Sequence, residues 1–161
     1  MRGRLGHVSI QVIERRTVRI ATLRYTGAFG EPLAGFWRKR VRPWLADHGL
    51  VDCPRYGIAL DNPRTTPEDQ CRYDAGVELP PGLSIPDAAQ ADLPGGRYAV
   101  TRFRGTAAQI GAAWDDFIGV CIAAELRFDH TRTAFEHYPR GARFDEKSGV
   151  FECELCFPVG S

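Results

Sequence analysis

One stretch of this chain of 161 residues occurs twice: Arg24-Tyr25-Thr26-Gly27 returns as Arg102-Phe103-Arg104-Gly105. Each copy is followed by a helix-like run that carries a tryptophan, Trp37 or Trp114, and then by two strand-like stretches. A repeat whose period is about half of the chain predicts one structural unit built twice. The chain should therefore fold with an internal pseudo-twofold symmetry.

Each half of this repeat is too small to fold alone. A unit with one helix buries little core, so the two halves should pack into a single domain, residues 1–161, with a cleft between them. We place the halves at about 7–80 and 86–159, because the proline-rich residues between them cannot continue the interior of a sheet. Clefts of this kind bind small molecules.

Hydrophobic patterning predicts the order strand, strand, helix, strand, strand in each half. Strands around residues 8–14 and 18–25 are joined by a turn at Arg15-Arg16, and Pro94-Gly95-Gly96 is the equivalent turn in the second half. Residues 71–79 alternate apolar and polar side chains, which indicates a strand with one face on the core. The expected fold is α+β, mainly an antiparallel sheet with two helices.

Both helices have recognisable starts. Pro32 fits the first turn of the helix that carries Trp37, and Pro43 should kink that helix or end it early. In the second helix, Thr106 as N-cap and Gln109 three residues later form a capping box. The apolar stripe that follows is Ile110, Ala113, Trp114, Phe117, Ile118 and Cys121.

Composition excludes several classes of protein. The 21 Lys and Arg residues nearly balance the 20 Asp and Glu residues, so direct binding to nucleic acid is not expected. No apolar run is long enough to span a bilayer, and the N-terminus lacks the apolar segment of a secretion signal, so we expect a cytoplasmic protein that does not bind membranes. The five cysteines are an odd number and should be free thiols.

Several stretches, in order along the chain, together carry a family likeness: Arg24-Tyr25-Thr26-Gly27, Arg72-Tyr73-Asp74-Ala75, residues 94–100, Phe135-Glu136-His137-Tyr138 and residues 154–159. With the two tryptophan helices they resemble the GyrI-like effector-binding domain. That domain occurs alone in gyrase-inhibitory proteins of the SbmC type, and fused to DNA-binding regions in AraC-type and MerR-type transcription regulators.

The resemblance implies a pocket between the halves, lined by aromatic residues, with an acidic residue on a strand of the second half that meets cationic or polar ligands. The matching acid is Glu136. Because the first family-like strand starts almost at Met1, we expect a stand-alone binder. The alternative is the excised effector domain of a transcription regulator.

The residues themselves support a ligand site around Glu136. A carboxylate in an apolar, aromatic strand is unfavourable unless a partner compensates it, and a ligand cation or donor would do so. The alternative is that Glu136 points to solvent or pairs with an arginine. Tyr138 should share its face, while Tyr56 and Tyr73 lie on strands that flank Glu136 or its counterpart.

The two tryptophans should stand on opposite sides of the cleft, where they suit flat or cationic ligands. Trp37 and Trp114 occupy equivalent places in the two helices. The alternative, to which we give equal weight, is that both side chains pack in the core.

No metal or cofactor is expected. Cys153 and Cys156 are three residues apart in a strand, so their side chains face opposite sides of the sheet and cannot grip one ion. The chain has no P-loop, dinucleotide fingerprint or nucleophile elbow. The basic run at residues 38–42 is interpreted as the solvent face of a helix.

The leading hypothesis is a non-enzymatic binder of lipophilic small molecules or toxins, cationic ones included. A second hypothesis is a cofactor-free hydrolase of electrophilic natural products, in which Glu136 and Tyr138 activate water or protonate a leaving group. A third is inhibition of DNA gyrase through protein contact. The chain should be a monomer or a homodimer.

Overall fold

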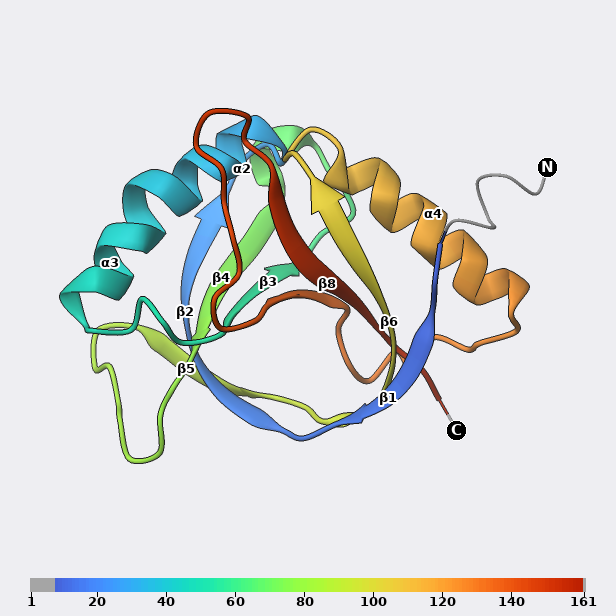
Figure 1. Cartoon of the computed structure of the whole chain (residues 1–161), viewed down its shortest axis with the longest axis horizontal. Coiled ribbons are helices and arrows are strands. Elements are labelled where there is room, and N and C mark those ends of the chain that lie inside the picture. The colour runs from blue at the N-terminus through green and yellow to red at the C-terminus, as the bar shows by residue number, and fades with distance from the viewer. Residues whose placement is uncertain (1–7, 161) are drawn as a thin grey trace.

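The computed structural model describes residues 8–160 and contains one antiparallel sheet built from both halves of the chain (Figure 1). The strands are β1 (Gln11–Arg15), β2 (Val18–Thr26), β3 (Arg55–Ala59), β4 (Arg72–Glu78), β5 (Ala89–Leu93), β6 (Gly96–Gly105), β7 (Phe135–Tyr138) and β8 (Phe151–Pro158). The helices are α2 (Glu31–Phe36), α3 (Arg42–Asp47) and α4 (Ile110–Ala123), with a π-helical segment η1 (Trp37–Val41) and a short 3-10 helix η2 (Glu68–Gln70). This confirms the predicted α+β class and the order of elements. The predicted start of the first half, residue 7, lies just outside the described residues.

The order of the strands in the sheet has the pseudo-twofold symmetry that the sequence repeat predicts. Across the sheet they run β1-β6-β8-β7-β3-β4-β2-β5. Replacing each strand by its counterpart in the other half (β1 by β5, β2 by β6, β3 by β7, β4 by β8) gives the same order reversed. The symmetry axis therefore passes between β3 and β7, which pair at the centre of the sheet with Gly57 opposite Glu136.

The first strand of each half pairs with the other half. β1 lies along β6 and β5 lies along β2. The sequence predicts a turn at Arg15-Arg16 between two strands, and these residues do link β1 to β2, but the strands they join are not sheet neighbours. Each link instead carries the chain across the axis, so the two halves exchange their first strands.

The two crossing links touch. The hydroxyl oxygen of Thr17 accepts a hydrogen bond from the N–H of Gly95 at 2.9 Å. A Cβ atom on Gly95 would lie only 2.5 Å from the carbonyl oxygen of Arg15, so this close approach of two backbones requires glycine. Through this exchange each half pairs with a strand of the other at both ends of the sheet.

The helices cover one face of the sheet as two separate layers (Figure 1). The stretch from α2 to α3 packs on β2 and β4, with Val41 and Leu45 buried there, and α4 packs on β6 and β8 through Phe117 and Cys121. On the other face the sheet curls, so side chains from β2, β3, β5, β6, β7 and β8 form a third core cluster without a helix. β3 and β7 lie between the strands that carry the two helical layers.

Pro43 does not end the first helix. The π-helical segment η1 comes immediately before it, and the N–H of Arg42 bonds to the carbonyl of Trp37, five residues back. Because proline lacks an N–H and its ring crowds the preceding turn, a widened turn accommodates it. The helical stretch then continues as α3.

The second helix starts one turn later than the capping box predicts. A hydrogen bond of 3.0 Å from the N–H of Gln109 to the carbonyl of Thr106 closes a turn first, and α4 begins at Ile110. One half of the predicted box is present, because the side chain of Gln109 accepts the N–H of Thr106 at 2.9 Å. The predicted apolar stripe of this helix is confirmed, since all of its residues pack in one core cluster.

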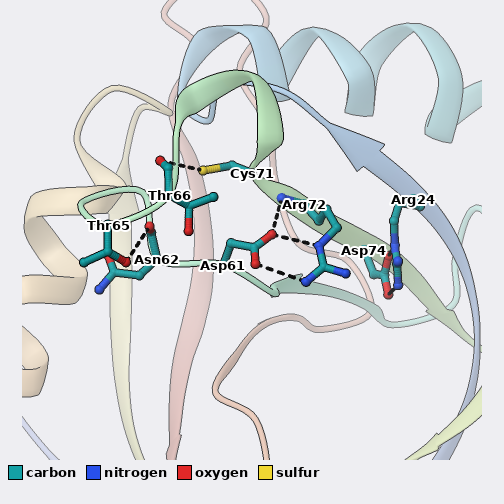
Figure 2. A network of polar contacts seen from close by, with 8 residues as sticks. All are labelled: Arg24, Asp61, Asn62, Thr65, Thr66, Cys71, Arg72 and Asp74. Carbon is teal, nitrogen blue, oxygen red and sulfur yellow. Dashed lines mark hydrogen bonds and ion pairs between the residues drawn. The ribbon is translucent and has the colours of Figure 1, made fainter.

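The polar face of β4 is held by ion pairs, which Figure 2 shows. Asp61 accepts two hydrogen bonds from the Arg72 guanidinium and one from its backbone N–H, and Arg24 grips Asp74 through two nitrogens. These arginines are about half exposed, so each pair stabilises the fold only modestly. Their main effect is to position Tyr73, because Arg72 and Asp74 flank it in the strand while its side chain points to the opposite face.

Candidate functional site

A cleft of about 560 Å³ opens on the helix-bearing face, above the centre of the sheet. One wall comes from α2, η1 and α3, and the other from the start of α4 and the loop of residues 142–149 that leads into β8. Its floor contains side chains of β3, β4 and β7. This volume is within the range that binds small organic molecules.

Glu136 lies at the bottom of this cleft, on β7, and is only 9% exposed. One carboxylate oxygen, Oε1, accepts the hydroxyls of Tyr73 at 2.9 Å and Tyr138 at 3.1 Å. The other, Oε2, accepts the indole N–H of Trp114 at 3.2 Å. Donors from β4, β7 and α4, which are far apart in the sequence, therefore converge on one acid.

All of these donors are neutral, and within residues 8–160 Glu136 forms no ion pair. Burial raises the pKa of its carboxyl above the ordinary value, and the hydrogen bonds from Trp114, Tyr73 and Tyr138 oppose that rise. Burial also raises the pKa of both tyrosines, as does the neighbouring carboxylate, so both keep their protons and remain donors. The acid is held in place, but its charge is not neutralised.

Gly57, opposite Glu136 on β3, makes room for this arrangement. A Cβ atom there would lie 2.6 Å from Oε1 of Glu136 and in severe overlap with the hydroxyl of Tyr73. Sequence reasoning missed this residue. The signal was available, because Gly57 holds the place in the first half that Glu136 holds in the second, and a glycine inside a strand often marks a close approach.

Aromatic rings surround the acid. The ring of Trp37 lies 5.5 Å from that of Tyr138 and 6.3 Å from that of Tyr73, and its indole N–H donates to the Tyr73 hydroxyl at 3.3 Å. Phe151 adds a further ring, 6.0 Å from Tyr138. The lower part of the cleft therefore combines one carboxylate with polarisable apolar surface.

The structure brings together five of the six residues that the sequence singles out. Glu136, Tyr138, Trp37 and Tyr73 line the cleft, and Trp114 reaches the acid from its position in the α4 core stripe. The two tryptophans thus approach the network from opposite helices. The structure does not bring Tyr56 into this group.

Tyr56 lies on the opposite face of the sheet, so its inclusion among the ligand-binding residues is corrected. Its ring stacks on His137 at 5.1 Å and its hydroxyl donates to Glu78 at 2.7 Å. The reason is the two-residue period of a strand: Gly57 points toward the cleft, so its neighbour Tyr56 points away. Position on a flanking strand did not reveal which face the side chain takes.

The upper part of the cleft is charged, which the sequence did not indicate. Basic side chains there are Arg38, Arg42, Arg143 and Lys147, with Arg55 on β3 nearer the floor, and the acidic ones are Glu31 and Glu146. Arg42 pairs with Glu146 at 3.3 Å and its guanidinium lies over the ring of Phe144, which ties the 142–149 loop to the first helix. Basic charge is therefore in excess around the opening.

The cysteines show no metal-binding arrangement within residues 8–160. All five are free, and Cys153 and Cys156 belong to different core clusters on opposite faces of the sheet. In the same part of the chain no three His, Cys, Asp or Glu side chains gather as ion ligands do. None of the described helices has the length and apolar character needed to cross a membrane.

The sequence profile of the GyrI-like small molecule binding domain matches residues 9–160, nearly the whole chain. The chain belongs to this family. The resemblance that its motifs suggest is thereby confirmed. Among curated relatives of this GyrI-like domain, a DNA gyrase inhibitor of Escherichia fergusonii is 26% identical over 142 residues, which cover 81% of this chain and 89% of the relative.

Solved structures share the fold of this GyrI-like domain at low sequence identity. SAV2435, solved with bound tetraphenylphosphonium, superposes with a TM-score of 0.66 at 16% identity, over 95% of this chain and 94% of the other. The C-terminal domain of EcmrR superposes with a TM-score of 0.66 at 8% identity, over 96% and 99%. These neighbours agree with the observed curled sheet and two helical layers.

Proposed function

We propose that this GyrI-like domain binds lipophilic aromatic small molecules in the cleft between its halves, with Glu136 as the polar anchor. The observation that carries the proposal is a buried carboxylate at the bottom of an aromatic-lined cleft, held only by neutral donors among residues 8–160. A buried charge without a counter-charge is unfavourable, and a ligand that supplies positive charge or a donor would relieve it.

The anchor has room for a single new partner. A carboxylate offers about four lone-pair sites, and the hydroxyls of Tyr73 and Tyr138 and the indole of Trp114 use most of them. One donor or one compact cation can therefore reach Glu136, while the rings of Trp37 and Tyr138 contact the rest of the molecule. The tetraphenylphosphonium bound to SAV2435 is also a lipophilic cation, but four phenyl groups shield its charge and it has no donor, so a cation of that type would act on Glu136 through charge alone.

Binding is tested with tetraphenylphosphonium and a neutral analogue, triphenylphosphine oxide, by calorimetry and thermal shift. We expect the cation to bind more tightly, and Glu136→Gln to abolish that preference while Glu146→Gln, a change to an exposed acid of the same cleft, preserves it. Equal affinity of the cation for the wild-type protein and Glu136→Gln would contradict the role of Glu136.

Hydrolysis is separated from binding by mass spectrometry of the same mixtures after incubation with electrophilic aromatic esters and epoxides. Ligands recovered intact support a binding module. Products that accumulate catalytically with the wild-type protein and not with Glu136→Gln would instead support a hydrolase, because a carboxyl of raised pKa can transfer protons.

Inhibition of DNA gyrase is a second candidate function, favoured by the similarity to a DNA gyrase inhibitor over most of both chains. It is tested by measuring the supercoiling of relaxed plasmid by gyrase with increasing amounts of this protein. Loss of supercoiling at micromolar protein supports this function, and unchanged supercoiling argues against it. Repeating the assay with Glu136→Gln shows whether the cleft takes part.

A further inference from the structure

The charges that line the cleft suit an anionic group as well as a cationic one. Five basic side chains line it against three acidic ones, Glu31, Glu136 and Glu146. The only ion pair among them joins Arg42 to Glu146, which leaves Arg38, Arg55, Arg143 and Lys147 without a carboxylate partner in the described part of the chain. For a ligand that carries only positive charge, repulsion by this basic rim would offset part of the attraction to Glu136.

Arg55 is the basic residue nearest to the floor. It lies opposite Tyr138 in the pairing of β3 with β7, and its guanidinium stands 5.9 Å from the centre of the Tyr138 ring. That ring belongs to the tyrosine whose hydroxyl bonds Glu136. The Tyr138 side chain therefore interacts with both charged groups, with the guanidinium through its ring and with the carboxylate through its hydroxyl.

The guanidinium of Arg55 is half-buried and largely unsatisfied. Among residues 8–160 its one side-chain hydrogen bond is a long one, 3.4 Å, to the carbonyl of Val51. A guanidinium has five N–H donors in a planar fork that matches a carboxylate. Burial lowers the pKa of Arg55, so a bound anion would relieve an unfavourable environment here too.

We propose that the ligand is amphoteric: an aromatic molecule whose cationic or donor group meets Glu136 and whose carboxylate meets Arg55. The proposal rests on the binding function proposed above and adds the second charge. One ligand then compensates both partly buried groups at once, while Arg143 and Lys147 at the rim attract the carboxylate end. The aromatic body of the ligand spans Tyr138, which lies between the two charges.

The test uses one rhodamine dye in two forms, the ethyl ester, which is a cation, and the free acid, which is a zwitterion with the same aromatic core. Fluorescence anisotropy gives the Kd of each form. Because a carboxylate on a half-buried guanidinium forms charge-assisted hydrogen bonds, we expect the zwitterion to bind about tenfold more tightly. The ratio of the two Kd values should fall as salt is raised, since the rim is open to solvent.

Arg55→Met keeps the length of the side chain and removes its charge. It should reduce the ratio to about one without weakening the ester, because the Met side chain can still pack on Tyr138. The control is Arg19→Met on β2, an exposed arginine paired with Asp92 outside the cleft, which should leave the ratio unchanged. Circular dichroism of both variants checks that they are folded.

Three results would overturn the amphoteric ligand, and two of them would leave the binding function intact. One is equal or tighter binding of the ester by the wild-type protein, and the other is a ratio that survives in Arg55→Met. Tight binding of the dianionic dye fluorescein that is insensitive to Glu136→Gln would also overturn it. If neither rhodamine form binds, and tetraphenylphosphonium does not bind either, the proposed function itself fails.

Discussion

Replacing Gly57 by alanine should disrupt the hydrogen bonds around Glu136, although Gly57 itself contributes no side chain to them. The added Cβ atom would overlap the hydroxyl of Tyr73 and lie 2.6 Å from Oε1 of Glu136, and neither group can withdraw easily. The Tyr73 side chain is 2% exposed and is held between the rings of Phe29 and Trp37. Glu136 is held by the donors described above.

The size of the effect follows from two contributions. Overpacking of a well-filled site costs about 1–3 kcal/mol. Displacing the Tyr73 hydroxyl also breaks a hydrogen bond to a buried carboxylate, worth about 1.5–3 kcal/mol. We expect Gly57→Ala to lower the free energy of unfolding by about 3 kcal/mol, and to weaken binding of tetraphenylphosphonium because Glu136 has moved.

Urea unfolding measures this loss, and Gly119→Ala is the matched control. Gly119 lies in α4 with open space around its Cβ position, so alanine should stabilise the protein by up to about 1 kcal/mol through helix propensity. The double variant Gly57→Ala/Tyr73→Phe removes the clashing hydroxyl and should recover part of the loss. A Gly57→Ala protein as stable as the wild type, with the same affinity for the cation, would refute this account of the site.

Three further predictions concern the acid, the crossing links and the two faces of the sheet. Because burial raises the pKa of Glu136 above the ordinary carboxyl value, its contribution to stability is complete below that ordinary value and is lost as the pH rises through the folded value. The wild type should therefore lose stability relative to Glu136→Gln as the pH rises above the ordinary carboxyl range, and parallel curves in thermal unfolding would contradict this. Gly95→Ala should lower the free energy of unfolding, measured with urea, by about 3 kcal/mol or more, because its Cβ would collide with backbone atoms of the other link and not with a movable side chain. A loss below about 1 kcal/mol would show that the links can separate. Tyr138→Phe removes a hydrogen bond that opposes the rise in the pKa of Glu136, so less of the acid is charged and tetraphenylphosphonium should bind several-fold more weakly in calorimetry. Tyr56→Phe should leave this binding unchanged, and equal effects of the two would contradict their placement on opposite faces.

The repeat let the sequence predict most of the fold. The two copies of the Tyr25 and Phe103 motif gave the order of elements, and the alternation at residues 71–79 correctly indicated which face of β4 meets the core, from Tyr73 to Val77. Local patterns carry this information because helices and strands have fixed side-chain periods. The exchange of β1 and β5 was not predictable in this way, since a short link allows either a hairpin or a crossing.

The candidate site was predicted in part. Glu136 stood out as a charge in an apolar strand, and Tyr138 followed from the two-residue period. Tyr56 was misplaced because nothing local said which face of β3 meets the cleft. Arg55 went unnoticed because its importance depends on the Tyr138 ring that pairs with it from the other half of the chain.

The sequence by itself determined the duplicated α+β architecture and the acid at its centre, because repeats and side-chain periods are written along the chain. Only the tertiary structure decided what surrounds that acid. Pairing β3 with β7 puts Gly57 against Glu136, and packing of the helices brings Trp114 to it and Trp37 to the Tyr73 hydroxyl that bonds it. These contacts join residues far apart in the chain, so no local pattern encodes them, and they set the charge, space and hydrogen bonding of the cleft.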